Sequence, residues 1–536
     1  MSRRKRHQHQ AQPIPAQRRA DQKNIPSSTE RVPRWSIHLL LIIIVAAAYL
    51  ALSLQQIGSP FNHVSEDTNG MHGIVLLNLM RFGYQNLHFG EYTEWLTDPS
   101  QSAVFGKFYA HHPNGFLIPT AILYQLFGPS ETTTRLGPLI LTLISIIFLY
   151  VAIVQLTGQP AAAFLVALTY ALLPGTVYYG KHLDMTPPGL AFTLITLAAF
   201  ILHVTTGRRG WFVFTLASIV LGGLMSWHYY LILPGIFLIL LIPRPGWTVP
   251  LRRWYLALLP LITAVPVLLN LYQIYVLNGA SGLAGLWGSF GGRSGRQPLG
   301  PWLSRMWWTG ELNINPIFFG LACLGLLVYA FLAWQRPRLR FLLPLFLLPF
   351  LTFVIFQQWS THPFGIILIL PAIAVLGGLL LGELVQRFGS TGMAITVIVL
   401  AIGLVFTQKE LAFFYDKFTI IGAKDIELLK QLAPKVGDGD ICEGKNEMGL
   451  YYGGITAWYL RHATLRTPEC FRAHSRLGLI FNPNLGPTYK QETQAFIDHG
   501  FTKVLGCAEL WCLLEKPNSG SWSGEAPAAA TSSPRR

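Results

Sequence analysis

Eleven apolar segments without a charged residue are the feature that most constrains this chain. The first covers residues 36–54, and its 19 residues are enough for a helix to cross the roughly 30 Å hydrocarbon core of a bilayer. We therefore expect an α-helical polytopic membrane protein with about eleven transmembrane helices. The other segments cover residues 136–156, 161–177, 187–204, 211–227, 229–243, 254–276, 316–334, 341–356, 364–382 and 392–407.

Positive charge is concentrated in the N-terminal tail and in the links between alternate pairs of segments. Residues 1–35 carry +7 and these links carry +8, which together equal the formal net charge of +15. Because cytoplasmic loops are enriched in Lys and Arg, the tail and the links are predicted to be cytoplasmic. The basic excess is thus a topology signal, and we expect no nucleic-acid partner. The links hold Arg208, Arg209, Arg244, Arg252, Arg253, Arg336, Arg338, Arg340 and Arg387, with Glu383.

The same charges predict a helical hairpin between residues 211 and 243. Arginines flank this stretch on both sides, so both of its ends should be inside and its corner, near Trp227, outside. Eleven spans then place the C-terminus outside. We expect a multi-pass protein of the inner (plasma) membrane with a cytoplasmic N-terminus.

Composition divides the chain into four parts. Residues 1–35 are polar and predicted to be a disordered cytoplasmic tail, and residues 36–407 form the transmembrane domain. Residues 408–516 are soluble in composition, and alternating helical and strand-like stretches there predict a small extracytoplasmic α/β domain. Residues 517–536, rich in Ser, Pro and Ala, are predicted to be a disordered tail.

Two long stretches lie on the predicted outer side. The first external loop, residues 55–134, contains apolar residues at helical spacing, which predicts two amphipathic helices lying in the membrane interface. The second, residues 277–315, is rich in Gly, Trp and Arg with little apolar period, and we expect a loop that could move as a flap. The first pattern comprises Met71, Val75, Leu79 and Phe82, and the second Leu117, Ile118, Ile122 and Leu126.

Four of the five cysteines lie in the predicted exterior domain, where disulfides can form. Cys507 and Cys512 flank a short segment and could close a hairpin, which would leave Cys442 to pair with Cys470. Free buried thiols are the alternative.

Five polar clusters fall on the predicted outer face, and each has an ordinary structural explanation as well. Helix capping would explain the first, hydration the pair of histidines, snorkelling the arginine, mutual pairing the lysine and aspartate, and an interfacial turn the last cluster. Their gathering on one side nevertheless suggests a ligand that is polar at one end and apolar at the other. The clusters contain Glu66 and Asp67; His111 and His112; Arg135; Lys181 and Asp184; and His362.

The order of these motifs resembles class C glycosyltransferases. An acid soon after the first span, amphipathic helices, a His-His-Pro motif and an Arg that opens the second span are similar to bacterial relatives of protein O-mannosyltransferases and of lipid A aminoarabinose transferases. The resemblance covers residues 36–407. It implies transfer of a sugar from a polyprenyl-phosphate-linked donor to a hydroxyl acceptor of the cell envelope (protein, lipid or glycan) on the outer face of the membrane.

The resemblance also suggests roles for individual residues. Asp67, beside Glu66, falls where the family has its catalytic Asp, and His111-His112-Pro113 falls where relatives have an acid or His, then Lys or His, then Pro. Arg135 matches the Arg that opens the second span. Asp184 matches an acid at the second external corner.

The chemistry fits these residue types. A polyprenyl phosphate, with a second pKa near ~6, can leave without a general acid if cations stabilise its charge. One base is then needed for the acceptor hydroxyl, and we expect Asp67 or Glu66 to supply it. The predicted substrate-binding groups are His111, His112, Arg135, Lys181, Asp184 and His362, with Arg293, Arg296 and Arg305 in reserve; a divalent metal is left open.

Two other classes of function compete with an enzyme. A transporter or flippase of lipid-linked sugars predicts ionisable residues at mid-membrane and paired halves with broken helices, and the sequence shows neither. A non-catalytic membrane scaffold would use its exterior domain to bind a partner. Loss of the carboxylate of Asp67 would affect an enzyme and neither alternative.

Overall fold

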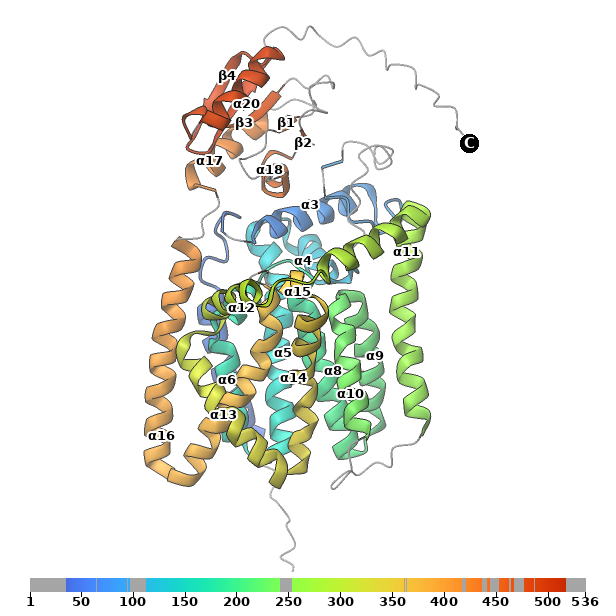
Figure 1. Cartoon of the computed structure of the whole chain (residues 1–536), viewed down its shortest axis with the longest axis vertical. Coiled ribbons are helices and arrows are strands. Elements are labelled where there is room, and N and C mark those ends of the chain that lie inside the picture. Colours follow the sequence, from blue (N-terminus) through green and yellow to red (C-terminus); the bar gives the residue numbers. More distant parts are fainter. Residues whose placement is uncertain are drawn as a thin grey trace, which may run out of the picture.

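The protein is a bundle of long helices with shorter helices and a small sheet gathered at one end, as the computed structural model shows (Figure 1). The C-terminal sheet lies beyond α3 (Asp67–Phe82), which crosses that end of the bundle. The structure describes residues 35–63, 65–93, 95–96, 112–241, 253–360, 362, 364–416, 421–435, 441–443, 453–461, 464–466, 477–485 and 487–516.

A helix lies at each of the eleven predicted apolar segments. Seven helical stretches among the described residues are long and apolar enough to cross a membrane, and the count of eleven spans stays a prediction. The helices are α2 (Trp35–Ser53), α5 (Glu131–Thr157), α6 (Pro160–Leu172), α8 (Thr186–Thr206), α9 (Arg209–Met225), α10 (Ile232–Leu241), α11 (Arg253–Arg293), α13 (Pro316–Gln335), α14 (Leu343–Ile355) and α16 (Leu370–Asp416).

Glycines with positive φ bend the two longest helices. α16 holds two predicted segments, and at Gly389 (φ 55°) the chain turns back so that the two halves form a hairpin (Figure 1). α11 bends at Gly279 (φ 58°), and its second part lies across the end of the bundle near α3. Only glycine adopts such backbone angles readily, so the positions of these two glycines in the sequence determine where both helices turn.

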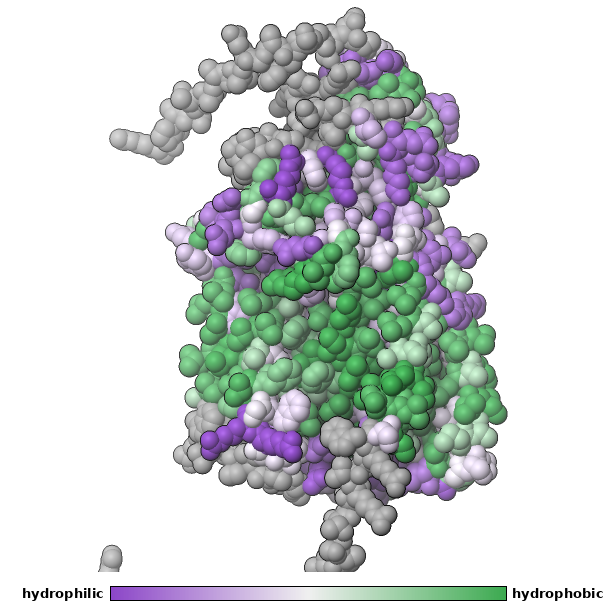
Figure 2. All heavy atoms as spheres, turned by 180° about the vertical axis from the view of Figure 1, so that it is seen from behind, coloured by the Kyte–Doolittle hydropathy of each residue, from purple (hydrophilic) through white to green (hydrophobic). Residues whose placement is uncertain are grey.

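The predicted hairpin at residues 211–243 is confirmed. α9 and α10 are joined by the short 3-10 turn η4 (Trp227–Leu231), at the predicted corner. On the face shown in Figure 2, a belt of apolar side chains covers the bundle at the height of the long helices, with hydrophilic residues above and below it. On α13, the side chains of Leu327 and Trp334 are 73% and 81% exposed, and such exposed apolar side chains indicate a surface that contacts lipid.

A helix lies at each of the two predicted amphipathic stretches of residues 55–134. The prediction that both lie in the membrane interface was wrong for α3, which packs inside the protein: Val75 and Leu79 are buried and share a core with Trp458. In α4 (Ile118–Phe127), Ile118, Ile122 and Leu126 point outward and are 54%, 52% and 67% exposed, as expected for a helix that presents an apolar face to lipid. A short turn, η3 (Gly115–Leu117), precedes α4.

The expectation of an irregular loop at residues 277–315 was wrong. The second part of α11 continues to Arg293, and α12 (Leu299–Ile314) follows it. Leu299, Leu303 and Trp307 recur every four residues on α12 and are all exposed, so this helix is itself amphipathic. Short elements complete this end of the bundle: α7 (Pro174–Tyr179), α15 (Gln357–Ser360) and η6 (Gly365–Ile369). At the opposite end, η5 (Pro337–Leu342) joins α13 to α14.

The C-terminal region is an α/β unit, as predicted. Its five strands have the order β2-β1-β3-β5-β4; β1 pairs in parallel with β2 and β3, whereas β5 runs antiparallel to β3 and β4. The strands are β1 (Ile441–Glu443), β2 (Thr464–Arg466), β3 (Leu477–Phe481), β4 (Lys503–Cys507) and β5 (Trp511–Glu515); the helices are α17 (Ala423–Leu432), η7 (Ala433–Lys435), α18 (Gly453–Leu460), η8 (Pro483–Leu485) and α20 (Pro487–Asp498).

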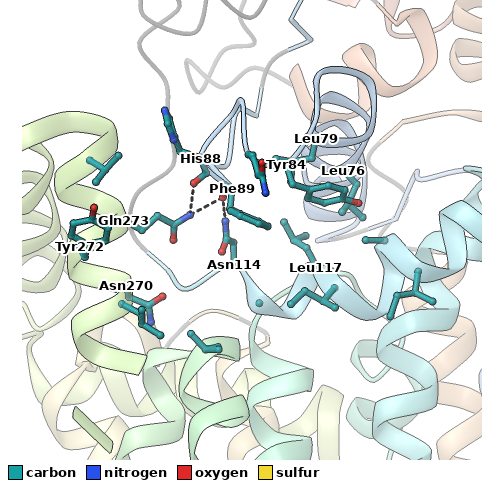
Figure 3. Close-up of a pocket in the computed structure, with 18 of the residues that line it drawn as sticks. Leu76, Leu79, Tyr84, His88, Phe89, Asn114, Leu117, Asn270, Tyr272 and Gln273 are labelled. Carbon is teal, nitrogen blue, oxygen red and sulfur yellow. Dashed lines mark hydrogen bonds between the residues drawn. The ribbon is translucent and has the colours of Figure 1, made fainter. Parts of the chain in front are cut away.

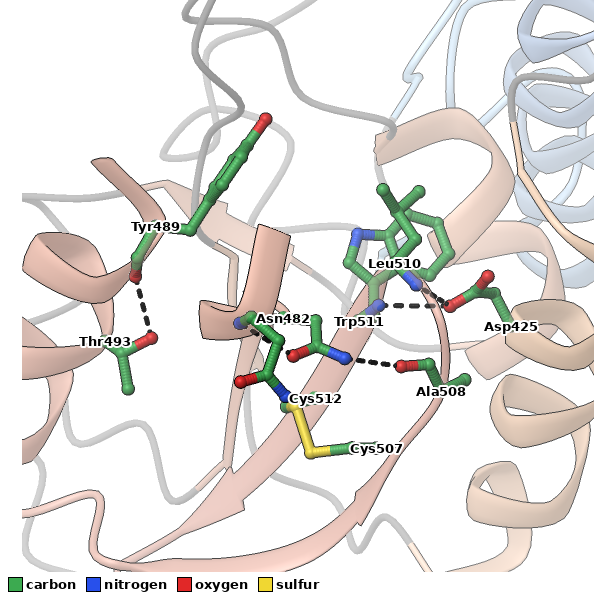
Figure 4. The surroundings of a disulfide bond; sticks show 10 residues. Asp425, Asn482, Tyr489, Thr493, Cys507, Ala508, Leu510, Trp511 and Cys512 are labelled. Atoms are coloured by element: carbon green, nitrogen blue, oxygen red, sulfur yellow. Dashed lines mark hydrogen bonds between the residues drawn. A yellow bond between two sulfur atoms is a disulfide. The ribbon is translucent and has the colours of Figure 1, made fainter. Parts of the chain in front are cut away.

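A disulfide closes the β4–β5 hairpin. Cys507 and Cys512 are bonded, which confirms the predicted pair, and they face each other in the strand register (Figure 4). Nearby, one carboxylate oxygen of Asp425 accepts the backbone N–H groups of Leu510 and Trp511 at 2.7 and 3.0 Å, which ties α17 to the hairpin. Cys470 and the side chain of Cys442 lie outside the described residues, as do the two predicted disordered tails apart from Trp35.

Candidate functional site

Glu66 and Arg135 form a buried ion pair where the first loop meets α5. Arg135 donates to Glu66 Oε1 from Nε at 3.1 Å and from Nη2 at 2.6 Å, and both side chains are almost fully buried. The other oxygen of Glu66 accepts the backbone N–H groups of Asn62 and His63, both at 3.2 Å. Burial alone would raise the pKa of Glu66, but Arg135, with His182 and His63, lowers it below its usual value.

Arg135 also fixes the backbone of the segment that leads to α3. Its guanidinium donates to the carbonyls of Ile57, Ser59 and Pro60 at 2.8, 2.5 and 3.2 Å. The position of Arg135 follows from the start of α5, where Ser130 and Thr133 form a capping box. Arg135 therefore pairs with Glu66, and the carboxylate of Asp67 is not part of this pair.

Asp67 is the first residue of α3 and stays accessible to solvent. The protein that surrounds it removes part of its hydration and raises its pKa; the backbone N–H groups of Thr68 and Asp67 itself oppose this shift, and the charges of Asp184 and Glu66 add to it. The helix N-cap, Glu66, makes no side-chain capping bond. Of the two adjacent acids, only Asp67 is free to meet a substrate.

A small cavity, here called the charged cavity, brings together three predicted residues from distant segments. Its volume is about 180 Å³. His112, Asp184 and His362 line it, together with Arg293 from the end of α11. Aromatic side chains form much of its wall, and the ring of His362 stacks on Phe364 at 5.3 Å. The remaining lining residues are Thr68, Met71, His72, Phe116, Met185 and Trp359.

α3 holds Asp184 in this cavity through two bonds to the neighbouring backbone. Asn69 Oδ1 accepts the N–H of Leu183 at 2.6 Å, and His72 Nδ1 donates to the Leu183 carbonyl at 2.7 Å. Asp184 itself accepts the N–H of Thr186 at 2.8 Å, at the start of α8. The first turns of α3 therefore position two acids, Asp67 and Asp184.

Lys181 lies away from the charged cavity. Its Nζ donates to the carbonyls of Ser53 and Gln55 at 3.1 and 2.6 Å and to the hydroxyl of Tyr415 at 2.8 Å. Burial, followed by the charge of Arg135, lowers the pKa of Lys181 to about 7, against the opposing effect of Glu66. Glu66, Arg135 and Lys181 are called the buried cluster below, because their groups are bonded within the protein.

Glu91 is a residue that sequence reasoning missed. Its side chain is 1% exposed, and neither carboxylate oxygen has a hydrogen-bond partner among the described residues. Burial, and next the charge of Asp184, raises its pKa well above the usual value. Asn78 fixes this segment by donating to the Tyr92 carbonyl and accepting the N–H of Leu96, both at 3.1 Å. The sequence signal was only an acid in an acidic loop.

A larger cavity, here called the apolar cavity, lies between α3, α4, α9 and α11 (Figure 3). It has a volume of about 870 Å³, and none of its described lining residues is Asp, Glu, Lys or Arg. Leucines and isoleucines of α3 and α4 belong to its lining, as do several amide side chains. One of these amides, Gln273, donates from Nε2 to the carbonyls of His88 and Phe89 at 3.1 and 2.8 Å.

The two cavities lie on either side of the same short segment. His112 and Phe116 line the charged cavity, whereas Asn114, Gly115 and Leu117 line the apolar one. α3 is shared in the same way, since His72 faces the first cavity and Leu76 the second.

His111 lies outside the described residues. No group of three or more His, Cys, Asp or Glu side chains is placed to hold a metal ion in the part of the chain that the structure describes.

Comparisons with known proteins agree with this architecture. Residues 111–270 match the family model described as dolichyl-phosphate-mannose-protein mannosyltransferase. The fold is similar to ArnT from Cupriavidus metallidurans bound to undecaprenyl phosphate, with a TM-score of 0.62, 15% identity, and coverage of 90% of this chain and 98% of that chain.

It is also similar to the oligosaccharyltransferase of Archaeoglobus fulgidus in the apo form, with a TM-score of 0.55, 13% identity and coverage of 84% of this chain and 70% of that one. AglB from the same organism, in complex with an inhibitory peptide and a dolichol-phosphate, gives a TM-score of 0.52, 14% identity, and coverage of 83% and 69%. A search of curated proteins by sequence gives no match. The chain therefore has the fold of a class C glycosyltransferase, the resemblance that its sequence motifs predicted.

Proposed function

We propose that this chain transfers a sugar from a polyprenyl-phosphate-linked donor to a hydroxyl acceptor of the cell envelope, with Asp67 as general base. The observation that carries this proposal is the pair of neighbouring cavities, one charged and one apolar, which suits an amphiphilic donor. The similarity to ArnT, solved with undecaprenyl phosphate, and to AglB, solved with a dolichol-phosphate, supports the same donor class.

The charged cavity would hold the phosphate and the sugar. Arg293 supplies a cation and His112 a hydrogen-bonding group there. A phosphate leaving group needs stabilisation of its developing charge, which such groups provide. Aromatic walls such as Trp359 offer flat apolar surfaces to a sugar ring. His111 and His362 remain predicted contacts.

The apolar cavity would hold the polyprenyl chain next to its head group. Its wall is apolar, and α4 exposes further apolar residues toward the lipid. Burial of isoprenoid carbon atoms there stabilises binding by roughly 25 cal/mol per Å² of apolar surface. A tail anchored at this site would present the phosphate to the charged cavity beyond the 112–117 segment.

Asp67 would take the proton of the acceptor hydroxyl. The acceptor oxygen then attacks the anomeric carbon, and the bond from that carbon to the phosphate oxygen breaks, with its electrons going to the phosphate. A raised pKa brings a carboxylate closer to the operating pH of a general base. Asp67 is accessible, whereas Glu66 is occupied by Arg135, and this difference favours Asp67.

Arg135 and Lys181 were predicted to contact the donor, but their donor groups are bonded to Glu66, backbone carbonyls and Tyr415. We propose that they do not contact the donor and instead hold in place the segment that carries Asp67. A divalent metal stays an open part of the prediction.

The orientation is part of the proposal. The charge distribution places the tail and the basic links in the cytoplasm, so both cavities lie at the outer face. In a Cys323→Ser background, a cysteine at the exposed Asn86 should react with an impermeant reagent added to intact cells. A cysteine at Arg338 should not, and its labelling would contradict this topology.

The reaction is tested with the purified protein in liposomes, supplied with undecaprenyl-phosphate-linked radiolabelled sugars one at a time. Mass spectrometry of envelope glycans and glycoproteins, with and without the gene, identifies the acceptor. Asp67→Asn keeps the size of the side chain and its capping ability, so a base predicts a folded protein whose transfer falls by on the order of 10²–10⁴ fold.

Asp498→Asn, at the exposed end of α20, is the matched control and should transfer at the normal rate. A fully active Asp67→Asn protein would remove Asp67 as the base and leave Glu66 as the candidate. Envelope glycans that stay unchanged in the absence of the gene would speak against an enzyme. Accumulation of lipid-linked sugars would then favour a transporter, and loss of a bound partner would favour a scaffold.

A further inference from the structure

The C-terminal α/β unit touches the segment between α2 and α3 at two consecutive residues. The hydroxyl of Tyr459, on α18, accepts the backbone N–H of Phe61 at 2.9 Å. The N–H of Ile421, just before α17, donates to the carbonyl of Asn62 at 3.4 Å. This segment leads to Glu66 and Asp67, so a soluble unit far along the chain holds the approach to the proposed base.

The hydroxyl of Tyr459 acts both as an acceptor and as a donor. It accepts the N–H of Phe61 and donates to Oε1 of Glu131 at 3.1 Å. Glu131 is the first residue of α5. Lys430 of α17 lies 3.8 Å from the same oxygen and over the ring of Tyr459. Tyr459 thus links the first loop to the start of α5, four residues before Arg135.

The ring of Phe61 continues this link to the buried cluster. The guanidinium of Arg135 lies 4.9 Å from the centre of that ring, and the ring of Trp458 packs on it at 5.3 Å. Trp458 also covers α3, because a Cβ atom added at Gly73 would lie only 2.6 Å from its ring. Phe61 and Trp458 are both buried. The contacts therefore run without a gap from α18 through Phe61 to Arg135 and Glu66.

We propose that the C-terminal unit is a working part of the active site, and that Tyr459 is a positioning residue which sets the place of Glu66 and Asp67 through Phe61 and Glu131. This inference rests on the proposed function. Tyr459 does not line the charged cavity, so it acts on the chemical step and leaves the binding of the donor lipid unchanged.

Tyr459→Phe tests this role because it removes one hydroxyl and keeps the ring. Transfer, measured with the donor sugar that proves active, should fall on the order of 10-fold, since small displacements of a catalytic group are costly. Binding of undecaprenyl phosphate, the probe for the donor lipid, should change less than about twofold. Tyr489→Phe makes the same chemical change on α20 of the same unit and should behave as the wild type.

Glu131 supplies a second variant that does not alter the C-terminal unit. Glu131→Gln keeps an oxygen that can accept from Tyr459 and should retain transfer, whereas Glu131→Ala removes the acceptor and should show the loss seen in Tyr459→Phe. A purely structural role predicts that transfer falls only as far as the folded fraction does, which size-exclusion chromatography and thermal unfolding measure.

A double variant separates this inference from the proposed function. If Tyr459 acts through Asp67, then Tyr459→Phe should cost nothing further in the Asp67→Asn background. The same fold-loss in both backgrounds, or wild-type transfer by Tyr459→Phe, overturns the inference. Full activity of Asp67→Asn alone instead overturns the base assignment, and a loss in Tyr459→Phe then supports positioning of Glu66.

Discussion

Two groups of charged residues lie close together at the end of the bundle that α3 crosses, and they differ in what surrounds them. In the buried cluster, Arg135 donates to Glu66 and to three carbonyls, and Lys181 donates to two carbonyls and a tyrosine hydroxyl. In the charged cavity, Asp184 and Arg293 border a space of about 180 Å³ that the described residues leave open.

The difference shows how to separate structural charges from functional ones. A charge whose hydrogen-bonding capacity is used inside the protein fixes geometry, and its removal strands a buried partner. A charge that lines a cavity can also contact a ligand there, and its removal changes binding or rate. Substitutions in the buried cluster should therefore mainly lower stability, whereas substitutions in the charged cavity should mainly change ligand binding.

The largest expected effect is on the stability of the buried cluster. Arg135→Leu leaves the carboxylate of Glu66 buried without its partner, which typically destabilises a protein by about 3–5 kcal/mol. We expect little folded protein, measured as thermal unfolding and as the monodisperse fraction in detergent. Addition of Glu66→Leu should restore part of the stability, because a buried ion pair is often replaceable by apolar groups.

Arg387 offers the control for this prediction. It pairs with Glu383 four residues away on α16, with a side chain that is 57% exposed. Surface pairs contribute roughly 0–1 kcal/mol, so Arg387→Leu should unfold near the wild-type temperature. Equal destabilisation by the two substitutions would show that burial does not distinguish the two arginines.

The next effect is on ligand binding in the charged cavity. Arg293→Gln should weaken binding of undecaprenyl phosphate by about 10- to 100-fold, because a hydrogen bond to a charged group contributes roughly 1.5–3 kcal/mol. Its unfolding temperature should stay the same. A titration followed by tryptophan fluorescence is suitable, since Trp359 lines the same cavity. Arg296→Gln, three residues away and exposed, should bind normally, and equal loss there would indicate only long-range attraction.

Most of the fold could be predicted from the sequence because a helix that spans a bilayer is marked by neighbouring apolar residues in the chain. A run of apolar residues long enough to span lipid signals a helix, and a helix lies at all eleven predicted segments. The prediction for residues 277–315 was wrong because the glycines near Trp287 obscure the helical spacing of the apolar residues. That spacing was nevertheless present in Leu299, Leu303 and Trp307.

The site was predictable in its residue types and not in its pairings. His112, Asp184 and His362 meet in one cavity, as their common face suggested. The partner of Arg135 lies 69 residues away, and the choice between Glu66 and Asp67 depends on which side chain the fold buries. No local pattern carries that information. Glu91 escaped notice for the same reason, because its burial is set by tertiary packing.

The smallest expected effect is that of Glu91 on the pH dependence of stability, which tests whether this acid belongs with the buried cluster. It is buried without a partner among the described residues, and burial, with the charge of Asp184 from the charged cavity, raises its pKa well above the usual value. A carboxyl group whose pKa is higher in the folded state stabilises folding most below its unfolded pKa, about 4.3, and this contribution is lost as the pH rises through the folded pKa. Glu91→Gln is neutral at every pH and escapes this loss.

The Gln variant should therefore unfold at the same temperature as the wild type at pH 4 and at a higher temperature at pH 7.5, with the gap widening between these values. Thermal unfolding in detergent at several pH values measures it, and Glu427→Gln on the exposed side of α17 should show no such trend. A gap that is constant with pH, or a wild type that is the more stable protein at pH 7.5, would mean that Glu91 is satisfied in the folded state and belongs with the buried cluster. A widening gap would mean that the protein retains a destabilising acid, as expected where stability is given up for function.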